Sequence, residues 1–132
     1  MKHSLKIRVY YEDTDAQGIV YYANYLKFFE RSRTEFLREV GYKQEKLMQK
    51  GAIFVVRAVD MKLLKPAKLD DIIEVSTGLS KLGRVTFNFY QEVRIKDELI
   101  CHAEIKCGCL SLDDFSAFPL PNSLHEGMKK LL

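Results

Sequence analysis

The sequence has no long apolar run, few cysteines and no block of like charge. A helix that spans a membrane needs about 18 to 20 consecutive apolar residues, and no run in this chain approaches that length. Although 30% of the residues are charged, the net charge is only +3, and Lys and Arg do not gather in a dense tract. We therefore expect no transmembrane segment and no nucleic-acid partner.

The three cysteines, Cys101, Cys107 and Cys109, are an odd number, so they cannot all pair with one another. They share one parity of a single predicted strand, which indicates small buried apolar side chains. Their spacing also lacks the C-x2-C pair that is typical of zinc sites. The sequence therefore predicts no disulfide framework and no metal site.

The length of 132 residues fits one domain with a core of its own, and neither a linker nor an internal repeat interrupts the chain. The N-terminus enters an alternating pattern at once, without the apolar stretch of a secretory signal. We expect a single domain over residues 1–132 and a cytoplasmic location.

Hydrophobic periodicity predicts a strand, a long helix, a short helix and then about four long strands. The long helix runs from about Ala23 to Val40, with Asn24 as its cap and Gly41 at its end. A short helix follows over about residues 44–50. The strands are expected over residues 5–11, 52–65, 71–82, 84–96 and 98–112. In the first strand, the inward set is Leu5, Ile7, Val9 and Tyr11. The apolar side of the long helix carries Tyr22, Tyr25, Leu26, Phe29, Phe36, Leu37 and Val40.

The connections at Leu82-Gly83 and Lys96-Asp97 are too short for a crossover, so the flanking strands must be antiparallel neighbours. One apolar helix against one curled antiparallel sheet is an α+β two-layer fold. On the helix, Arg33 projects into the apolar side, and an ion pair with Glu30 is the simplest account of it. A catalytic role for Glu30 is the second reading.

Residues 13–26 place two carboxylates and a glycine turn just before the apolar helix. A carboxylate in a loop that leads into a helix can face the free backbone N–H groups of the first helical turn, which bind oxyanions. A carboxylate beside an oxyanion site indicates hydrolysis of an acyl group.

This segment, Asp-Thr-Asp-x-x-Gly-x-Val-Tyr-Tyr-x-Asn-Tyr followed by Phe-Phe-Glu-Arg-Ser-Arg-Thr-Glu, resembles the signature of the hot-dog-fold acyl-CoA thioesterases. It is most similar to the YbgC-like (Tol-Pal-associated) branch and more distantly similar to 4-hydroxybenzoyl-CoA thioesterase. The resemblance is densest over residues 8–38, and the order of elements agrees to about residue 122. It implies a long central helix wrapped by a curled antiparallel sheet of about five strands.

The resemblance also implies a function and an assembly. An acyl-CoA would be hydrolysed to the free acid and coenzyme A, with no cofactor beyond the coenzyme A of the substrate. We expect a homodimer with its active sites between protomers, and a homotetramer formed from paired dimers. An acyl carrier protein or an envelope-associated protein is a further expected partner.

The resemblance assigns the catalytic role to Asp15, which either attacks the thioester carbonyl or activates a water. Asp13 is expected to stabilise the turn. Tyr22 stands where many YbgC-like proteins carry histidine, so we expect this tyrosine to donate a hydrogen bond or to wall the pocket. The expected substrate-binding and oxyanion residues around the helix start are Gly18, Ile19, Val20, Tyr21, Tyr22 and Ala23.

Two other functions stay open at this stage. A hot-dog dehydratase would need a pocket histidine, and no histidine lies between His3 and His102. A binding module for acyl-CoA or acyl carrier protein would hold its ligand without hydrolysis. We assign no role to His3, His102 or His125, and we expect the C-terminal tail to cover an edge of the sheet. The candidate contacts for the coenzyme A phosphates are Arg57, Lys62, Lys65, Lys81 and Arg84.

Overall fold

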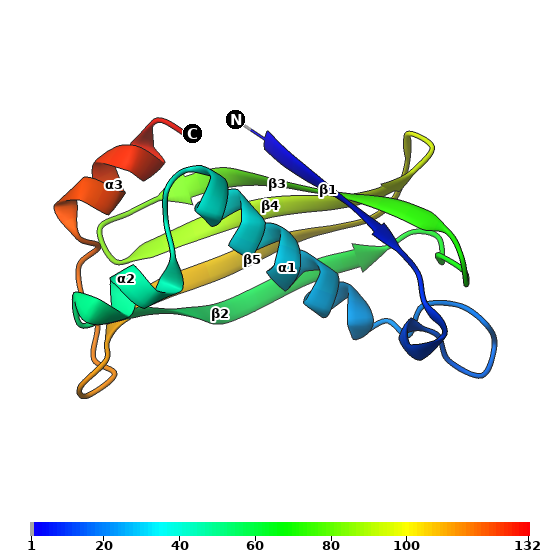
Figure 1. Ribbon diagram of the computed structural model, residues 1–132, viewed down its shortest axis with the longest axis horizontal. Helices are drawn as coiled ribbons and strands as arrows, with labels where there is room; N and C mark the ends of the chain where they lie inside the picture. Colours follow the sequence, from blue (N-terminus) through cyan, green and yellow to red (C-terminus); the bar gives the residue numbers. More distant parts are fainter. Residues whose placement is uncertain (1) are drawn as a thin grey trace.

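Five antiparallel strands curl around one long helix in the computed structural model, which describes residues 2–132 (Figure 1). The order of strands in the sheet is β1-β3-β4-β5-β2. The predicted α+β architecture, with about five strands around a long central helix, is confirmed. The elements are β1 (Lys2–Arg8), η1 (Tyr11–Asp13), α1 (Asn24–Glu39), α2 (Gln44–Gln49), β2 (Ala52–Leu63), β3 (Ile72–Leu82), β4 (Thr86–Ile95), β5 (Glu98–Ser111) and α3 (Asn122–Lys129).

The three central strands follow the alternation of the sequence. In β4, every second side chain from Phe87 to Val93 is buried, and the residues between them are half-buried on the outer face. The turn from β4 to β5 consists of Lys96 and Asp97, whose φ angles are 48° and 69°. Two positive φ angles in succession are what a tight hairpin requires. The predicted antiparallel pairing of β3 with β4 and of β4 with β5 is confirmed.

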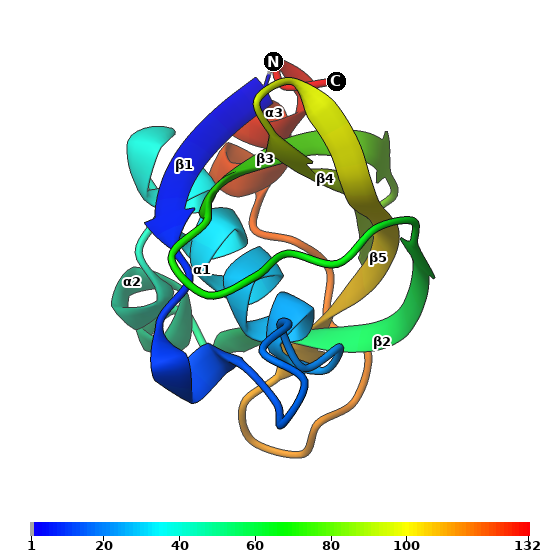
Figure 2. The same ribbon diagram turned by 90° about the vertical axis from the view of Figure 1, so that its right-hand side faces the viewer.

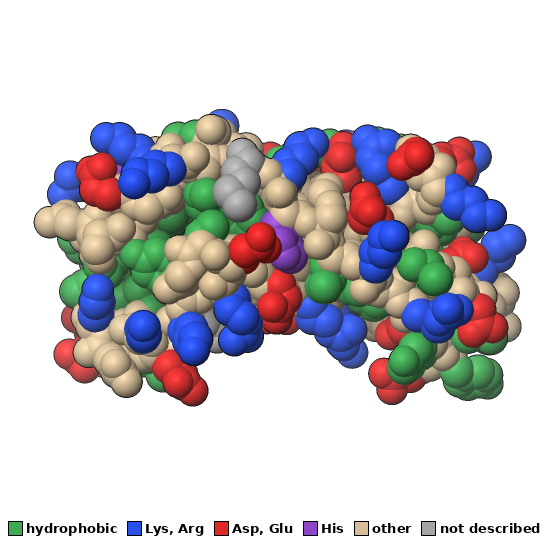
Figure 3. All heavy atoms as spheres, turned by 45° about the horizontal axis from the view of Figure 1, so that its top comes forward, with side chains coloured by type: hydrophobic (Ala, Val, Ile, Leu, Met, Phe, Trp, Pro, Cys, Tyr) green, Lys and Arg blue, Asp and Glu red, His purple; other side chains and the backbone are tan. Residues whose placement is uncertain are grey.

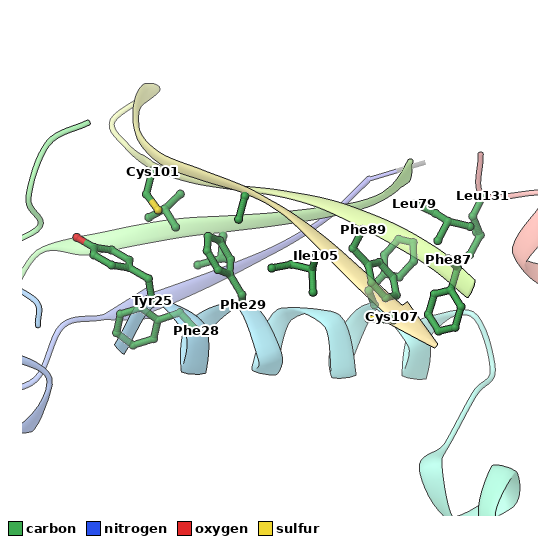
Figure 4. Close-up of a cluster of buried hydrophobic side chains, with 14 of the residues drawn as sticks. Tyr25, Phe28, Phe29, Leu79, Phe87, Phe89, Cys101, Ile105, Cys107 and Leu131 are labelled. Carbon is green, nitrogen blue, oxygen red and sulfur yellow. The ribbon is translucent and has the colours of Figure 1, made fainter. Parts of the chain in front are cut away.

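The core lies between α1 and the concave face of the sheet, and aromatic rings fill most of it (Figure 4). Tyr25, Phe28 and Phe29 enter from the first turns of α1, where they meet residues of the sheet. Farther along, Phe36 contacts Phe89 edge to face, with 6.0 Å between the ring centroids. These contacts fix the distance between helix and sheet.

The predicted apolar faces of two elements need correction. Phe28 is fully buried although it was not assigned to the inner side, whereas Leu26 is 40% exposed. The cause is that α1 packs chiefly against β1 and β3, which leaves its opposite side open. Tyr11 is 83% exposed rather than inward, because β1 ends at Arg8 and the chain turns into η1.

A buried polar cluster joins the middle of α1 to the sheet. Gln91 is fully buried, and its Nε2 donates to Thr77 Oγ1 at 2.7 Å and to Phe29 O at 3.0 Å. Arg33 Nη1 donates to Gln91 Oε1 at 3.0 Å. The predicted ion pair of Arg33 with Glu30 is therefore wrong, because Arg33 turns toward β4 while Glu30 accepts from Thr34 Oγ1 at 3.0 Å.

The ends of α1 are set by different means. Gly41 follows the helix with a φ of 95°, and the next N–H, that of Tyr42, donates to Leu37 O at 2.7 Å. The predicted role of Gly41 is confirmed. At the other end Ala23, not Asn24, is the cap residue, because the Asn24 side chain is used in a contact with the preceding loop.

The C-terminal tail covers the part of the sheet that β1 does not reach. β1 pairs with β3 only up to Gly78, and α3 contacts β3. Leu131 lies beside Leu79 in Figure 4, and both side chains are buried. This agrees with the expected covering role of the tail.

All three cysteines are buried and free, and burial raises the pKa of the Cys101 thiol to about 12.

On the face that Figure 3 shows, positive and negative side chains are interspersed around a hydrophobic hollow. Within the described part of the chain, no helix combines the length and the apolar character needed to cross a bilayer.

Candidate active site

The chain between β1 and α1 folds into a tight loop that presents Asp15. Thr14 and Val20 face each other in an antiparallel bridge, and the Asp15 N–H donates to Ile19 O at 2.9 Å. Gly18 closes the loop, with its N–H donating to Asp15 O at 3.0 Å and a φ of 79°. Glycine adopts this left-handed conformation without the steric cost of a side chain.

The two carboxylates of the Asp-x-Asp sequence have different surroundings. Asp13 is 7% exposed and both of its oxygens are engaged: Oδ1 accepts from Asn24 Nδ2 at 2.8 Å, and Oδ2 accepts from the Tyr10 N–H at 2.9 Å. The Asp15 side chain is half-buried, and its Oδ1 accepts from the Gln17 N–H at 2.9 Å. Among residues 2–132, no group donates to Asp15 Oδ2.

A second loop, residues 64–71 between β2 and β3, holds the Asp15 loop against the helix. The Val20 N–H donates to Ala67 O at 2.8 Å, and the Leu69 N–H donates to Gly18 O at 3.3 Å. The Ala67 N–H in turn donates to the hydroxyl of Tyr25 on α1 at 3.2 Å. Figure 2 shows both loops crossing the end of the curled sheet in front of α1.

The two loops and the start of α1 line an open pocket of about 300 Å³. Four of the predicted site residues line this pocket, namely Asp15, Ile19, Val20 and Tyr22. Tyr22 is 58% exposed, and its ring lies 5.0 Å from that of Tyr21, centroid to centroid. The lining residues that sequence reasoning did not assign to the site are Tyr25, Leu63, Leu64 and Pro66.

The backbone amides around the helix start fall into two groups. The N–H groups of Gly18, Val20 and Tyr21 already donate to backbone carbonyls, at 3.0, 2.8 and 3.0 Å. In the part of the chain that the structure describes, the N–H groups of Ile19, Tyr22 and Ala23 have no acceptor. The candidate oxyanion donors are therefore the N–H group of Ile19 in the loop and the two amides that immediately precede α1.

Of the cations considered for phosphate binding, Lys65 lines the Asp15 pocket, and its Nζ lies 2.6 Å from Glu98 Oε2. Lys81 and Arg84 flank the turn between β3 and β4, at the opposite end of the sheet from the Asp15 loop (Figure 1). His3 is also remote from the pocket, because it pairs with Glu39 at the far end of α1 at 2.9 Å. No histidine lines the pocket.

Comparison with known proteins identifies the family. Residues 9–128 match the Thioesterase-like superfamily. The acyl-CoA thioesterase YbgC of Haemophilus influenzae is 38% identical over 129 residues, which cover 97% of this chain and 95% of that protein. The acyl-CoA thioester hydrolase YbgC of Escherichia coli is 39% identical over 125 residues, with coverage of 94% and 93%. A solved structure from Aquifex aeolicus is 32% identical with a TM-score of 0.89, and the match covers 96% of this chain and 98% of that one. The chain therefore belongs to the thioesterase-like superfamily and has its hot-dog fold.

Proposed function

We propose that the protein hydrolyses the thioester bond of an acyl-CoA, with Asp15 as the reacting carboxylate. The observation that supports this most is the difference in hydrogen bonding between Asp13 and Asp15. Asp13 has both oxygens bound in the structure, whereas Asp15 keeps one oxygen free in a pocket beside the start of α1. The named relatives catalyse the same reaction class.

The chemistry asks for little beyond this carboxylate. A thiol with a pKa near 8.5 leaves readily, so protonation of the leaving group contributes little. The developing oxyanion needs donors, and the Tyr22 and Ala23 amides supply two at the positive end of the helix dipole. The Tyr22 ring walls the mouth of the pocket, and Lys65 at its rim is our choice for contact with a phosphate of coenzyme A.

Asp15 acts either as nucleophile, through a mixed anhydride, or as general base toward a water. Rapid-quench kinetics over the first turnover separate these routes. Release of coenzyme A ahead of the free acid is the mark of the covalent route, because the acyl group then stays on Asp15. Simultaneous release of both products is the mark of the general-base route.

The function is tested by measuring thiol release from a panel of acyl-CoAs, with calorimetric titration of the same compounds in parallel. We expect catalytic release of coenzyme A, and we expect it to persist after dialysis against a chelator, since no metal or other cofactor takes part. Tight binding without release of thiol would identify a binding module instead and would reject the proposal.

We also propose a homodimer formed through β2. This strand pairs only with β5, which leaves its other edge open among the described residues. Val56, Val59 and Leu63 pair with the buried Cys107, Ile105 and Cys101, so they point to the concave side, yet they are 48%, 43% and 49% exposed. An open edge with exposed inward apolar side chains is suited to pairing with a second copy.

A dimer through β2 would also bring the second copy close to the site, because Leu63 and Leu64 at the end of this strand line the Asp15 pocket. A tetramer of paired dimers stays a prediction, which a measurement of the protein's mass in solution tests. We place the protein in the cytoplasm, where the reducing environment keeps thiols such as its three buried cysteines free.

A further inference from the structure

Tyr25 is a buried polar residue in the lining of the Asp15 pocket. The residue is 2% exposed, and its ring packs edge to face on Phe28 with 6.1 Å between the centroids. In Figure 4 the oxygen of Tyr25 points away from the other labelled side chains of the core.

The hydroxyl of Tyr25 uses only half of its hydrogen-bonding capacity within the chain. Its oxygen accepts from the Ala67 N–H at 3.2 Å. No described residue accepts the hydroxyl proton, although a phenol both donates and accepts. Leaving a buried donor without an acceptor is unfavourable, so the free proton favours any ligand that brings an oxygen to it.

The Tyr25 hydroxyl is linked by hydrogen bonds to the loop that carries Asp15. Helical side chains lean toward the N-terminus of their helix, so the ring extends from α1 back toward Tyr22 and the loop. The hydroxyl oxygen accepts from the N–H of Ala67. The carbonyl oxygen of Ala67 in turn accepts from the N–H of Val20, at the end of the Asp15 loop. The donor thus lies in the same wall as the loop that carries Asp15. Burial raises the pKa of Tyr25, so the phenol stays protonated at neutral pH.

We infer that the Tyr25 hydroxyl donates a hydrogen bond to an acceptor oxygen of the acyl group, close to the thioester, and so makes the pocket selective for oxygen-bearing acyl chains. Most of the remaining wall is apolar, formed by Ile19, Val20, Leu63, Leu64 and Pro66. Apart from Asp15 and Tyr25, the polar residues in the lining are Tyr22, which is 58% exposed, and Lys65, which pairs with Glu98. A plain alkyl chain would leave the Tyr25 proton buried without an acceptor, whereas a 3-oxoacyl group brings an acceptor to it. Sites of this kind reject analogues that lack the bonded group more strongly than apolar pockets reject a missing methylene.

The inference rests on the proposed thioesterase function, and a ratio of two substrates tests it. Acetoacetyl-CoA and butyryl-CoA differ in the oxygen at the third carbon. We expect the wild-type kcat/KM to favour acetoacetyl-CoA at least tenfold, and we expect Tyr25→Phe to remove that preference. The variant also loses the acceptor for the Ala67 N–H, which lowers stability, but such a loss acts on both substrates and cancels in the ratio.

The matched control is Tyr90→Phe, which removes a hydroxyl that donates to Glu92 on the outer face of the sheet. Its substrate ratio should equal that of the wild type. A wild-type ratio near one, or a Tyr25→Phe ratio equal to that of the wild type, would overturn the inference. A fall of both substrates by the same factor would also overturn it, because it would show that Tyr25 only supports the loop.

Failure of the proposed function is distinguishable from failure of this inference. If the wild type releases no thiol, the dissociation constants of the two acyl-CoAs still report on Tyr25 by calorimetry. The same titration on an Asp15→Asn protein gives the ratio without turnover. Should Tyr25→Phe not fold, equal affinities of the two compounds for the Asp15→Asn protein would still overturn the inference.

Discussion

Asp13 and Asp15 are two residues apart and chemically identical, yet the fold gives their carboxylates different burial and different hydrogen-bond partners. Asp13 is buried with donors on both oxygens, which stabilises its charge and ties the loop to α1. Asp15 has one oxygen free in the pocket. The sequence around the two acids does not show which of them faces a pocket. The catalytic role was therefore assigned to Asp15 only through the family resemblance.

The buried thiols give the protein a pH dependence in the alkaline range. Burial raises the pKa of Cys101 to about 12 and that of Cys107 to about 11. An unfolded chain ionises these thiols near pH 8.5. From about pH 9 to 11, therefore, the unfolded state releases protons that the folded state retains, and the free energy of unfolding falls by at most about 1.4 kcal/mol per pH unit for each thiol.

Below pH 8 this contribution to stability is fully present. Urea denaturation between pH 7 and 10.5 measures the slope, and we expect Cys101→Ala to decline less steeply than the wild type. The variant has a lower stability at pH 7 because it loses buried volume, but only its slope is informative here. Equal slopes for the two proteins would contradict the assigned pKa of Cys101.

At the level of elements, a buried side-chain contact of Asn24 with Asp13 joins η1 to α1, in addition to the backbone bond from the Tyr21 N–H to Asp13 O. This contact explains why the polar residue at the start of the helix was wrongly predicted to be its cap. A side-chain donor that bonds across 11 residues has no local sequence signature, whereas Gly41 at the other end acts through its own backbone and was predicted.

Removal of this contact should weaken both the fold and the site. We expect Asp13→Ala to lower the free energy of unfolding by about 2 to 3 kcal/mol, because it leaves the Asn24 amide and the Tyr10 N–H without their acceptor. It should also lower kcat, because the Asp15 loop loses its tie to α1. The measurements are a urea titration and thiol release.

The control for this variant is Glu12→Ala, a change at the exposed neighbour in the same turn. It should alter stability by no more than about 0.5 kcal/mol. If the two variants unfold at the same urea concentration, the buried contact does not have the importance assigned to it.

At the scale of the whole molecule, the strands were predictable and the pocket was not. Alternation along β3, β4 and β5 is a local property, and it located these strands to within a few residues. The pocket joins Tyr25 to Leu63 and Pro66, about 40 residues away. These residues meet only because β2 lies at the end of the sheet order and the following loop returns to α1. The periodicity of one segment does not predict which distant segments it contacts.

The exposed concave side of β2 supports the prediction of a dimer. We expect light scattering on the wild type to give twice the chain mass of 15.3 kDa, or four times that mass for paired dimers. Val59→Asp places a charge on the exposed concave side of β2 and should dissociate the assembly to the chain mass.

The matched control is Asp60→Ala at the next residue, which lies on the opposite side of β2 and should leave the mass unchanged. A wild type that runs as a monomer at micromolar concentration would contradict the dimer. So would a Val59→Asp variant with the mass of the wild type.

The turnover of an Asp15→Asn variant shows whether the free carboxylate of Asp15 carries out the reaction. The amide keeps the shape of the side chain but neither attacks a carbonyl nor removes a proton from water, so we expect kcat for acyl-CoA hydrolysis to fall by at least about a hundredfold. The melting temperature should stay near that of the wild type, and the exposed control Asp113→Asn should keep full activity. Undiminished thiol release by a folded Asp15→Asn protein would contradict the account.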